Sequence, residues 1–233
     1  MITQGAMMAA GGGGSTELEV IGVSESDVSV EINSRSLDEP VGIAPGDTMV
    51  VIGAGVEAVF GGSSEWDTIT GFNERYDTDF TTSDYPVGLW ADKVRAGSSL
   101  DIPSSDVSLT GSYNKDAVLI AIALRNLGSY SNKTMATFAD TSISVLAGQH
   151  IIYAAIALDD YVNSSSDVEV TGTPTGFTLI GRYWDVTGLS GYNKTTGMSV
   201  FYKTATATGT EVIAHPGSNA PYEAAMAVVY NAV

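Results

Sequence analysis

The chain has 233 residues, of which 44% are hydrophobic, 10 are basic and 27 are acidic, so its formal net charge is −17. This balance argues against nucleic acid and anionic membrane as partners, because both are bound by clustered Lys and Arg. Cysteine is absent, which excludes thiol catalysis, Cys-based zinc sites and a disulfide framework.

The first sixteen residues predict an arm followed by a tether. Ile2, Met7 and Met8 make the arm mildly apolar, and the glycines from Gly11 to Gly14 form a flexible tether. Such a segment is either a frayed chain end or an arm that docks onto a neighbouring subunit, and both interpretations stay open. The segment lacks the basic and long apolar regions of a signal peptide, so we expect none. We also expect no membrane-spanning helix, because no apolar run approaches 20 residues.

Strand patterns follow the tether along the rest of the chain. Val28, Val30 and Ile32 alternate with polar residues, which indicates a strand with one buried face. The apolar run 117–124 is rich in Val and Ile, which favours a central strand covered on both faces. No stretch shows a capped helical stripe, so we expect an all-β fold. Further strands are expected at 48–60, 87–95 and 107–110.

Three segments recur in the same order at a nearly constant spacing, which predicts an internal duplication. The alternative is that any two β-sandwiches share turn glycines and apolar strands. The duplication predicts two tandem β-sandwich, jelly-roll-like domains at 17–128 and 129–233, after the arm and tether at 1–16. The matched positions are Gly46 with Gly148, Trp90 with Phe201, and Gly111 with Gly217.

The two histidines give no support to a nucleophilic active site. His150 falls at a predicted strand start and His215 directly precedes Pro216. Neither is accompanied by a Ser in a nucleophile-elbow frame, so we expect both to be structural or surface residues.

Acidic and aromatic residues are densest between residues 65 and 90. A pair of carboxylates could hydrolyse glycosides, and rings among acids could bind a sugar or a partner. A solvated loop anchored by its aromatics explains the same pattern. The acids are Glu65, Asp67, Glu74, Asp77, Asp79 and Asp84, and the possible glycan or partner contacts are Trp66, Tyr76, Tyr85, Tyr183 and Trp184.

We expect no catalytic residue, metal or cofactor from these clusters. The corresponding part of the second copy lacks the dense acids, although a catalytic pair duplicated with the fold would occur twice. The pairs Asp77 with Asp79 and Asp159 with Asp160 lack a calcium-loop pattern.

Four pieces occur in order in the second half of the chain: Leu146–Tyr153, Thr175–Ile180, Phe201–Glu211 and Tyr222–Asn231. Together they resemble a repeat of structural proteins of tailed bacteriophages, clearly over 140–233 and faintly over 40–126. The resemblance implies a virion component and carries over no catalytic residue.

The expected function is therefore that of a non-enzymatic virion structural protein assembled in the host cytoplasm. A capsid decoration or cement protein, binding shell subunits through the arm and one sandwich face, fits best, and a head-fibre or tail component belongs to the same class. The expected partners are the major capsid protein or tail proteins and further copies of the chain. The alternatives are a glycan-binding module for host recognition and, more remotely, a glycan-degrading enzyme.

Overall fold

The computed structural model describes residues 17–25, 34–35, 37–57, 65–66, 69–79, 86–97, 107–110, 115–137, 140–158, 168–184, 196–218, 220 and 222–233. Every regular element in these ranges is a β-strand, so the predicted all-β fold class is confirmed. The strands are β1 (Glu19–Glu25), β2 (Ser34–Arg35), β3 (Thr48–Glu57), β4 (Glu65–Trp66), β5 (Asn73–Asp79), β6 (Pro86–Val94), β7 (Val107–Thr110), β8 (Lys115–Arg125), β9 (Leu127–Thr137), β10 (Thr141–Val145), β11 (His150–Leu158), β12 (Thr178–Trp184), β13 (Thr196–Thr204), β14 (Gly209–Ile213) and β15 (Tyr222–Ala232).

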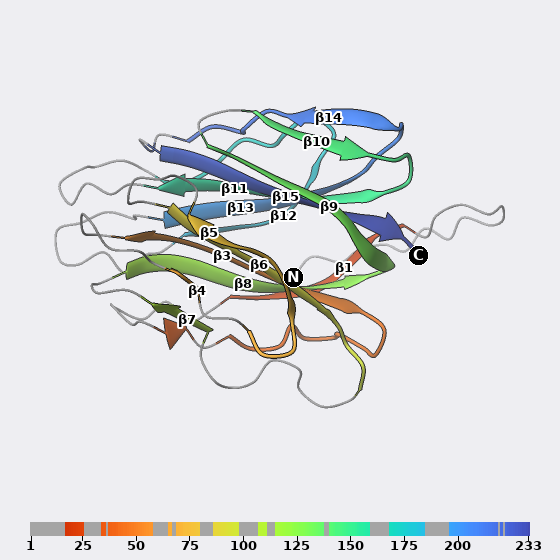
Figure 1. Cartoon of the computed structure of the whole chain (residues 1–233), viewed down its shortest axis with the longest axis horizontal. Helices are drawn as coiled ribbons and strands as arrows, with labels where there is room; N and C mark the ends of the chain where they lie inside the picture. Colours follow the sequence, from red (N-terminus) through yellow and green to blue (C-terminus); the bar gives the residue numbers. More distant parts are fainter. Residues whose placement is uncertain are drawn as a thin grey trace.

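Two antiparallel five-stranded sheets face each other in the middle of the molecule (Figure 1). The first sheet has the order β1-β8-β3-β6-β5 and the second has the order β12-β13-β11-β15-β9. The chain passes from one sheet to the other at Asn126, whose φ of 66° makes the tight connection between β8 and β9. Each half of the chain therefore builds one large sheet, and the change of sheet lies close to the predicted boundary at residue 128.

Outer layers cover the far face of each large sheet. The β10–β14 pair lies over the second sheet, and the small strands β2, β7 and β4 lie on the far side of the first (Figure 1). Each half consequently has a core of its own, in which Ile143, Val145 and Ile213 pack in the second half and Leu37 and Ile43 pack in the first.

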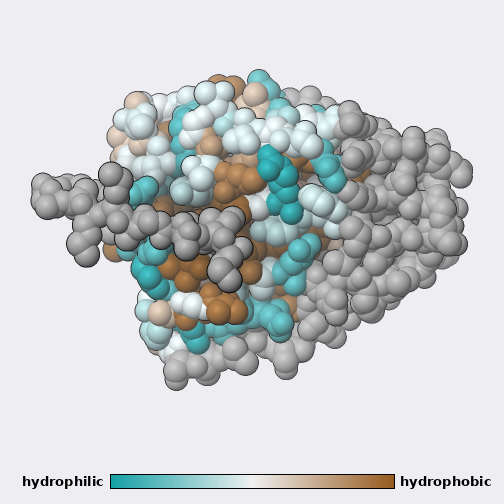
Figure 2. Space-filling view, turned by 180° about the vertical axis from the view of Figure 1, so that it is seen from behind, coloured by the Kyte–Doolittle hydropathy of each residue, from teal (hydrophilic) through white to brown (hydrophobic). Residues whose placement is uncertain are grey.

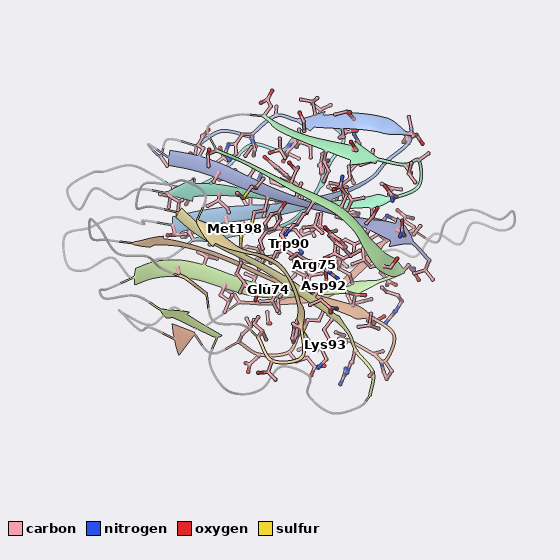
Figure 3. The ribbon with its side chains drawn as sticks, in the orientation of Figure 1. Glu74, Arg75, Trp90, Asp92, Lys93 and Met198 are labelled. Carbon is pink, nitrogen blue, oxygen red and sulfur yellow. The ribbon has the colours of Figure 1, made fainter. Side chains whose placement is uncertain are left out.

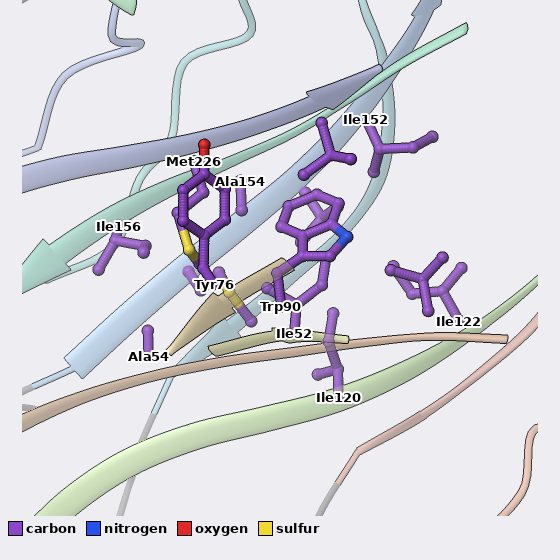
Figure 4. Packing of buried hydrophobic residues seen from close by; sticks show 14 of the residues in the cluster. Ile52, Ala54, Tyr76, Trp90, Ile120, Ile122, Ile152, Ala154, Ile156 and Met226 are labelled. Atoms are coloured by element: carbon purple, nitrogen blue, oxygen red, sulfur yellow. The ribbon is translucent and has the colours of Figure 1, made fainter. Parts of the chain in front are cut away.

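The largest core lies between the two large sheets and joins the halves. Trp90 is fully buried in it, among isoleucines that come from both sheets (Figure 4). The side chains alternate along each strand, so that Val50 and Ile52 point into this central core while Met49 and Val51 point into the outer one. Strand β8 is buried on both faces over 117–124, as its apolar run predicts. The division into two separate domains stays a prediction.

The two halves share one strand arrangement. Reading each sheet from the strand that comes first in the chain gives the same order of connections, β1-β8-β3-β6-β5 and β9-β15-β11-β13-β12. The turns before β3 and β11 also agree, since Gly46 (φ 93°) donates to the carbonyl of Arg95 at 2.9 Å and Gly148 (φ 88°) to that of Ala205 at 2.8 Å. The predicted match of these two glycines is thus reproduced by the geometry, and a common ancestor of the halves stays a prediction.

One of the matched pairs is shifted by one residue. Strand β6 pairs with β3, and β13 with β11, in registers that make Val200 the counterpart of Trp90. Both side chains enter the central core, whereas Phe201 points into the outer core of the second half. The predicted strand around Val28, Val30 and Ile32 and the matched Gly111 lie outside the described residues.

Candidate protein interface at one edge of the sandwich

The sandwich has two long edges, each formed by the last strand of one sheet lying over the last strand of the other. At one edge β5 lies over β9, where the guanidinium of Arg75 stands 4.2 Å from the centre of the Tyr130 ring. At the other edge β1 lies over β12, where the charge of Glu25 acts on Tyr183. Because β5 corresponds to β12 and β1 to β9, the two edges have matching backbones and can be compared residue by residue.

The edge formed by β5 and β9 is closed by charged side chains. A bulge between Glu74 and Tyr76 turns Arg75 toward the sheet interface, where its guanidinium donates to both carboxylate oxygens of Asp92 at 2.6 and 2.9 Å (Figure 3). The same guanidinium stacks on Tyr130 of the opposite sheet. The hydrogen bond to Asp92 raises the pKa of Arg75, so the guanidinium keeps its positive charge. We call this side the closed edge.

Lys133 completes the closed edge from the second sheet. Its ammonium group lies 4.5 Å from the centre of the Tyr76 ring and donates to the backbone carbonyl of Arg75. The Tyr76 ring is buried beneath it, and burial raises the pKa of the Tyr76 hydroxyl. The charged end of Lys133 therefore lies over an aromatic ring of the first sheet.

A chain of hydrogen bonds continues from the closed edge into the central core. The Trp90 indole Nε1 donates to the Tyr230 hydroxyl at 3.1 Å, and that hydroxyl donates to Asp92 Oδ2 at 2.9 Å. Burial, assisted by the negative charge of Asp92, raises the pKa of Tyr230 well above its ordinary value. Asp92 thus links Arg75 of its own sheet to Tyr230 of the other, and the two halves of the chain are held together by polar as well as apolar contacts.

The edge formed by β1 and β12 carries apolar residues at the corresponding positions. A bulge between Leu179 and Gly181 repeats the bulge at Arg75, and Ile180 occupies the place of that arginine. Val20 corresponds to Tyr130 and Val23 to Lys133 by their pairing with β8 and β15.

Tyrosines complete this second edge. Tyr202 corresponds to Asp92 by strand register. Gly181 corresponds to Tyr76, and the ring of Tyr183 folds back into the space that a side chain at position 181 would fill. Burial, and secondarily the charge of Glu25, raises the pKa of Tyr183 to about 12. We call this set the open edge, which consists of Val20, Val23, Ile180, Tyr183 and Tyr202.

The open edge is only partly covered by the rest of the described protein. All five of its side chains pack against the central core yet stay half-buried. The view from behind faces this side and shows apolar residues across its middle, with hydrophilic residues above and below (Figure 2). Both β1 and β12 also end their sheets, so each carries one outward row of backbone N–H and C=O groups with no neighbouring strand in the described part of the chain.

The residues predicted as glycan or partner contacts do not gather on one surface. Tyr76 is 7% exposed and Tyr183 is half-buried, and they enter the central core from opposite edges. Trp184 points to the other face of β12 and packs against the outer core of the second half. Trp66 belongs to β4 without a described side chain, and Tyr85 lies outside the described residues. The predicted docking residues Ile2, Met7, Met8, Gly11 and Gly14 also lie outside them.

The two histidines lie on different parts of the second half of the chain. His150 is buried at the start of β11, where its Nδ1 lies 3.0 Å from the Thr204 hydroxyl and burial lowers its pKa. His215 Nδ1 lies 3.4 Å from Glu223, and burial lowers its pKa as well. No three acidic or histidine side chains within the described ranges are placed to hold a metal ion. Of the acidic cluster only Glu74 has a described side chain, and it is exposed on β5.

Comparison with family models, curated proteins and solved structures finds no significant match to this chain. The part of the chain that the structure describes contains no helix long and apolar enough to span a bilayer. The open edge is the strongest candidate site, because half-buried apolar side chains lie there beside two strands that end their sheets. Sequence reasoning did not single out its valines and isoleucine, because apolar residues on a strand are ordinarily assigned to a core.

Proposed function

We propose that the protein is a non-enzymatic structural protein that self-associates through its open edge and contributes to a larger shell. The observation that carries this proposal is the contrast between two edges of matching backbone. Arg75 and Lys133 cover the closed edge with charge, whereas Ile180 and Val23 leave apolar surface at the open edge. Apolar side chains beside unpaired strand backbone favour contact with another protein.

A virion is the proposed setting of this assembly. The sequence resemblance to structural proteins of tailed bacteriophages supports that setting, in which the protein would be a capsid decoration or cement protein or a tail-associated component. Such a protein works by burying surface between neighbouring subunits, so its mechanism needs no reacting group. Its partners would be further copies of itself and the shell or tail proteins beneath it.

The test transfers the chemistry of the closed edge to the open edge. The double variant Val23→Lys, Ile180→Arg gives the open edge the lysine and arginine that stand at the equivalent positions of the closed edge. The fold is expected to tolerate it, because the closed edge already holds these residues on a matching backbone. The control is Val212→Lys, since Val212 is 60% exposed on β14, away from both edges. Circular dichroism and urea unfolding establish that all three proteins are folded.

Sedimentation velocity over a range of protein concentrations then reads out association. We expect the unaltered protein and the Val212→Lys control to form oligomers, and the double variant to sediment as a monomer. A monomeric unaltered protein at every concentration, or a double variant that associates equally well, would contradict the proposal.

A further inference from the structure

We propose that the open edge of one copy receives the N-terminal segment 1–16 of a neighbouring copy, whose residues 2–8 add as an extended strand beside β1. This inference rests on the proposed self-association and names the chain segment that covers the edge. Four observations lead to it: the size of the edge, the composition of the segment, its point of attachment and its length.

The open edge by itself is small for a stable interface. A seven-residue strand such as β1 is about 23 Å long, and facing sheets lie about 10 Å apart, so the strip between them covers on the order of 200–300 Å². Stable interfaces bury roughly 800 Å² per partner. Self-association through this edge therefore needs a further segment that brings apolar surface to it.

The N-terminal segment has the composition that the edge requires. The chain carries 27 acidic side chains against 10 basic ones, yet residues 1–16 contain no charged side chain. An apolar strip on a strongly acidic protein is best covered by a segment free of negative charge, because acidic surfaces of two copies repel each other. The segment supplies Ile2, Met7 and Met8 as apolar groups.

The segment also joins the described protein at the end of the open edge. Leu18 is buried in the central core, and the Asn126 side chain donates to the backbone carbonyl of Glu17 at 2.9 Å, immediately before β1 begins. Beyond this anchored point the glycines Gly11 to Gly14 allow the chain to take any direction. Residues 9–16 can span up to about 26 Å, which is enough to reach the edge of an adjacent subunit.

The length and pattern of residues 2–8 match an added strand. The stretch is as long as β1, which ends its sheet and has no strand on its outer side among the described residues. Strand addition of this kind takes its affinity from main-chain hydrogen bonds and its specificity from alternate side chains. Ile2, Ala6 and Met8 fall on one face of such a strand, together with Gln4, and would cover Val20 and Val23.

The absence of cysteine allows a direct test by crosslinking in the full chain. One preparation carries Met8→Cys and the other Val23→Cys, and the two are mixed under mild oxidation. We expect a disulfide-linked heterodimer at a yield roughly tenfold above that of Met8→Cys mixed with Val212→Cys, because docking raises the local thiol concentration. A variant that lacks residues 1–14 should remain folded, by circular dichroism, and sediment as a monomer.

The possible failures separate this inference from the proposed function. If the shortened protein assembles as the full chain does, the segment is not the occupant, although self-association through the edge stands. If the full chain is itself monomeric, both fail. If a crosslink forms only within a single chain that carries both cysteines, and never between mixed chains, the segment covers its own edge and exchange between copies is overturned.

Discussion

The carboxylate of Asp47 and the side-chain amide of Gln149 hold the same turn in the two halves of the chain. Asp47 accepts the backbone N–H of Ala44 at 2.8 Å, and Gln149 accepts that of Leu146 at 2.7 Å. Each then binds the end of the neighbouring strand, but by different chemistry. Asp47 accepts two hydrogen bonds from Arg125, at 2.9 and 3.0 Å, whereas Gln149 donates to Asn231 at 2.8 Å.

This substitution of an amide pair for an ion pair predicts different salt responses in the two halves. Asp47→Ala should lower the free energy of unfolding by about 1–3 kcal/mol, because the Ala44 N–H loses its acceptor. Part of this loss should disappear in 1 M salt, where the ion pair with Arg125 is screened. Gln149→Ala should cost a similar amount with no such salt dependence. Urea unfolding at low and high salt measures both, and equal salt responses would contradict the comparison.

The hydrogen-bond chain at the closed edge makes the Tyr230 hydroxyl energetically important. Tyr230→Phe leaves the Trp90 indole without its acceptor and removes one of the donors to Asp92, so we expect a loss of about 1–3 kcal/mol in unfolding free energy. Tyr76→Phe is the matched control, because the Tyr76 hydroxyl is buried with no hydrogen-bond partner among the described residues. Its removal should be neutral or slightly stabilising, and chemical denaturation of both variants distinguishes the two outcomes.

Burial of His150 predicts a pH-dependent contribution to stability. Its pKa in the folded protein is lowered from the ordinary 6.5, so the folded state holds it neutral while the unfolded chain takes up a proton below about pH 6.5. Its contribution to stability is present above that pH and is lost as the pH falls toward the lowered value.

The variant His150→Gln isolates this contribution. As the pH falls from 7.5 to 5, the free energy of unfolding of this variant should decrease by less than that of the unaltered protein. The pKa of His215 is lowered too, so the variant should keep part of the slope. Identical slopes would show that His150 does not titrate as its burial requires.

Two glycines distinguish close packing from free space. A side chain at position 197 would meet the backbone carbonyl oxygen of Val168, so Gly197→Ala should shift the backbone and cost about 1–3 kcal/mol. Gly97 has nothing within 4 Å of the corresponding position, and Gly97→Ala should leave the thermal midpoint nearly unchanged. The reverse ranking in thermal unfolding would contradict this account of the β13 packing.

The all-β class and several strands could be predicted because their signals are local. The run 117–124 is buried on both faces, and His150 begins a strand, as the sequence indicates. The one-residue shift between Trp90 and Phe201 arose because β6 and β13 carry apolar residues on both faces. A period-two pattern cannot fix the register of such strands.

The central core and the two edges depend on how the halves meet, which no local pattern records. Tyr76 was expected as a possible glycan contact because it sits among acids, but it lies buried beneath Lys133 of the other half. Ile180 stands out as an interface residue only when the strand registers show that it is the equivalent of Arg75 in the other half. The halves are offset by 102 residues at the Gly46 and Gly148 turns but by 105 between Arg75 and Ile180, so an alignment of the halves on these turns alone does not reveal this difference.

The most direct test of the open edge is hydrogen–deuterium exchange of the full chain at low and high protein concentration. If the open edge is the site of association, amides of β1 and β12 become protected as concentration rises, while those of β5 and β9 at the closed edge exchange at unchanged rates. Protection confined to β5 and β9, or no change at any strand while the protein oligomerises, would contradict the account.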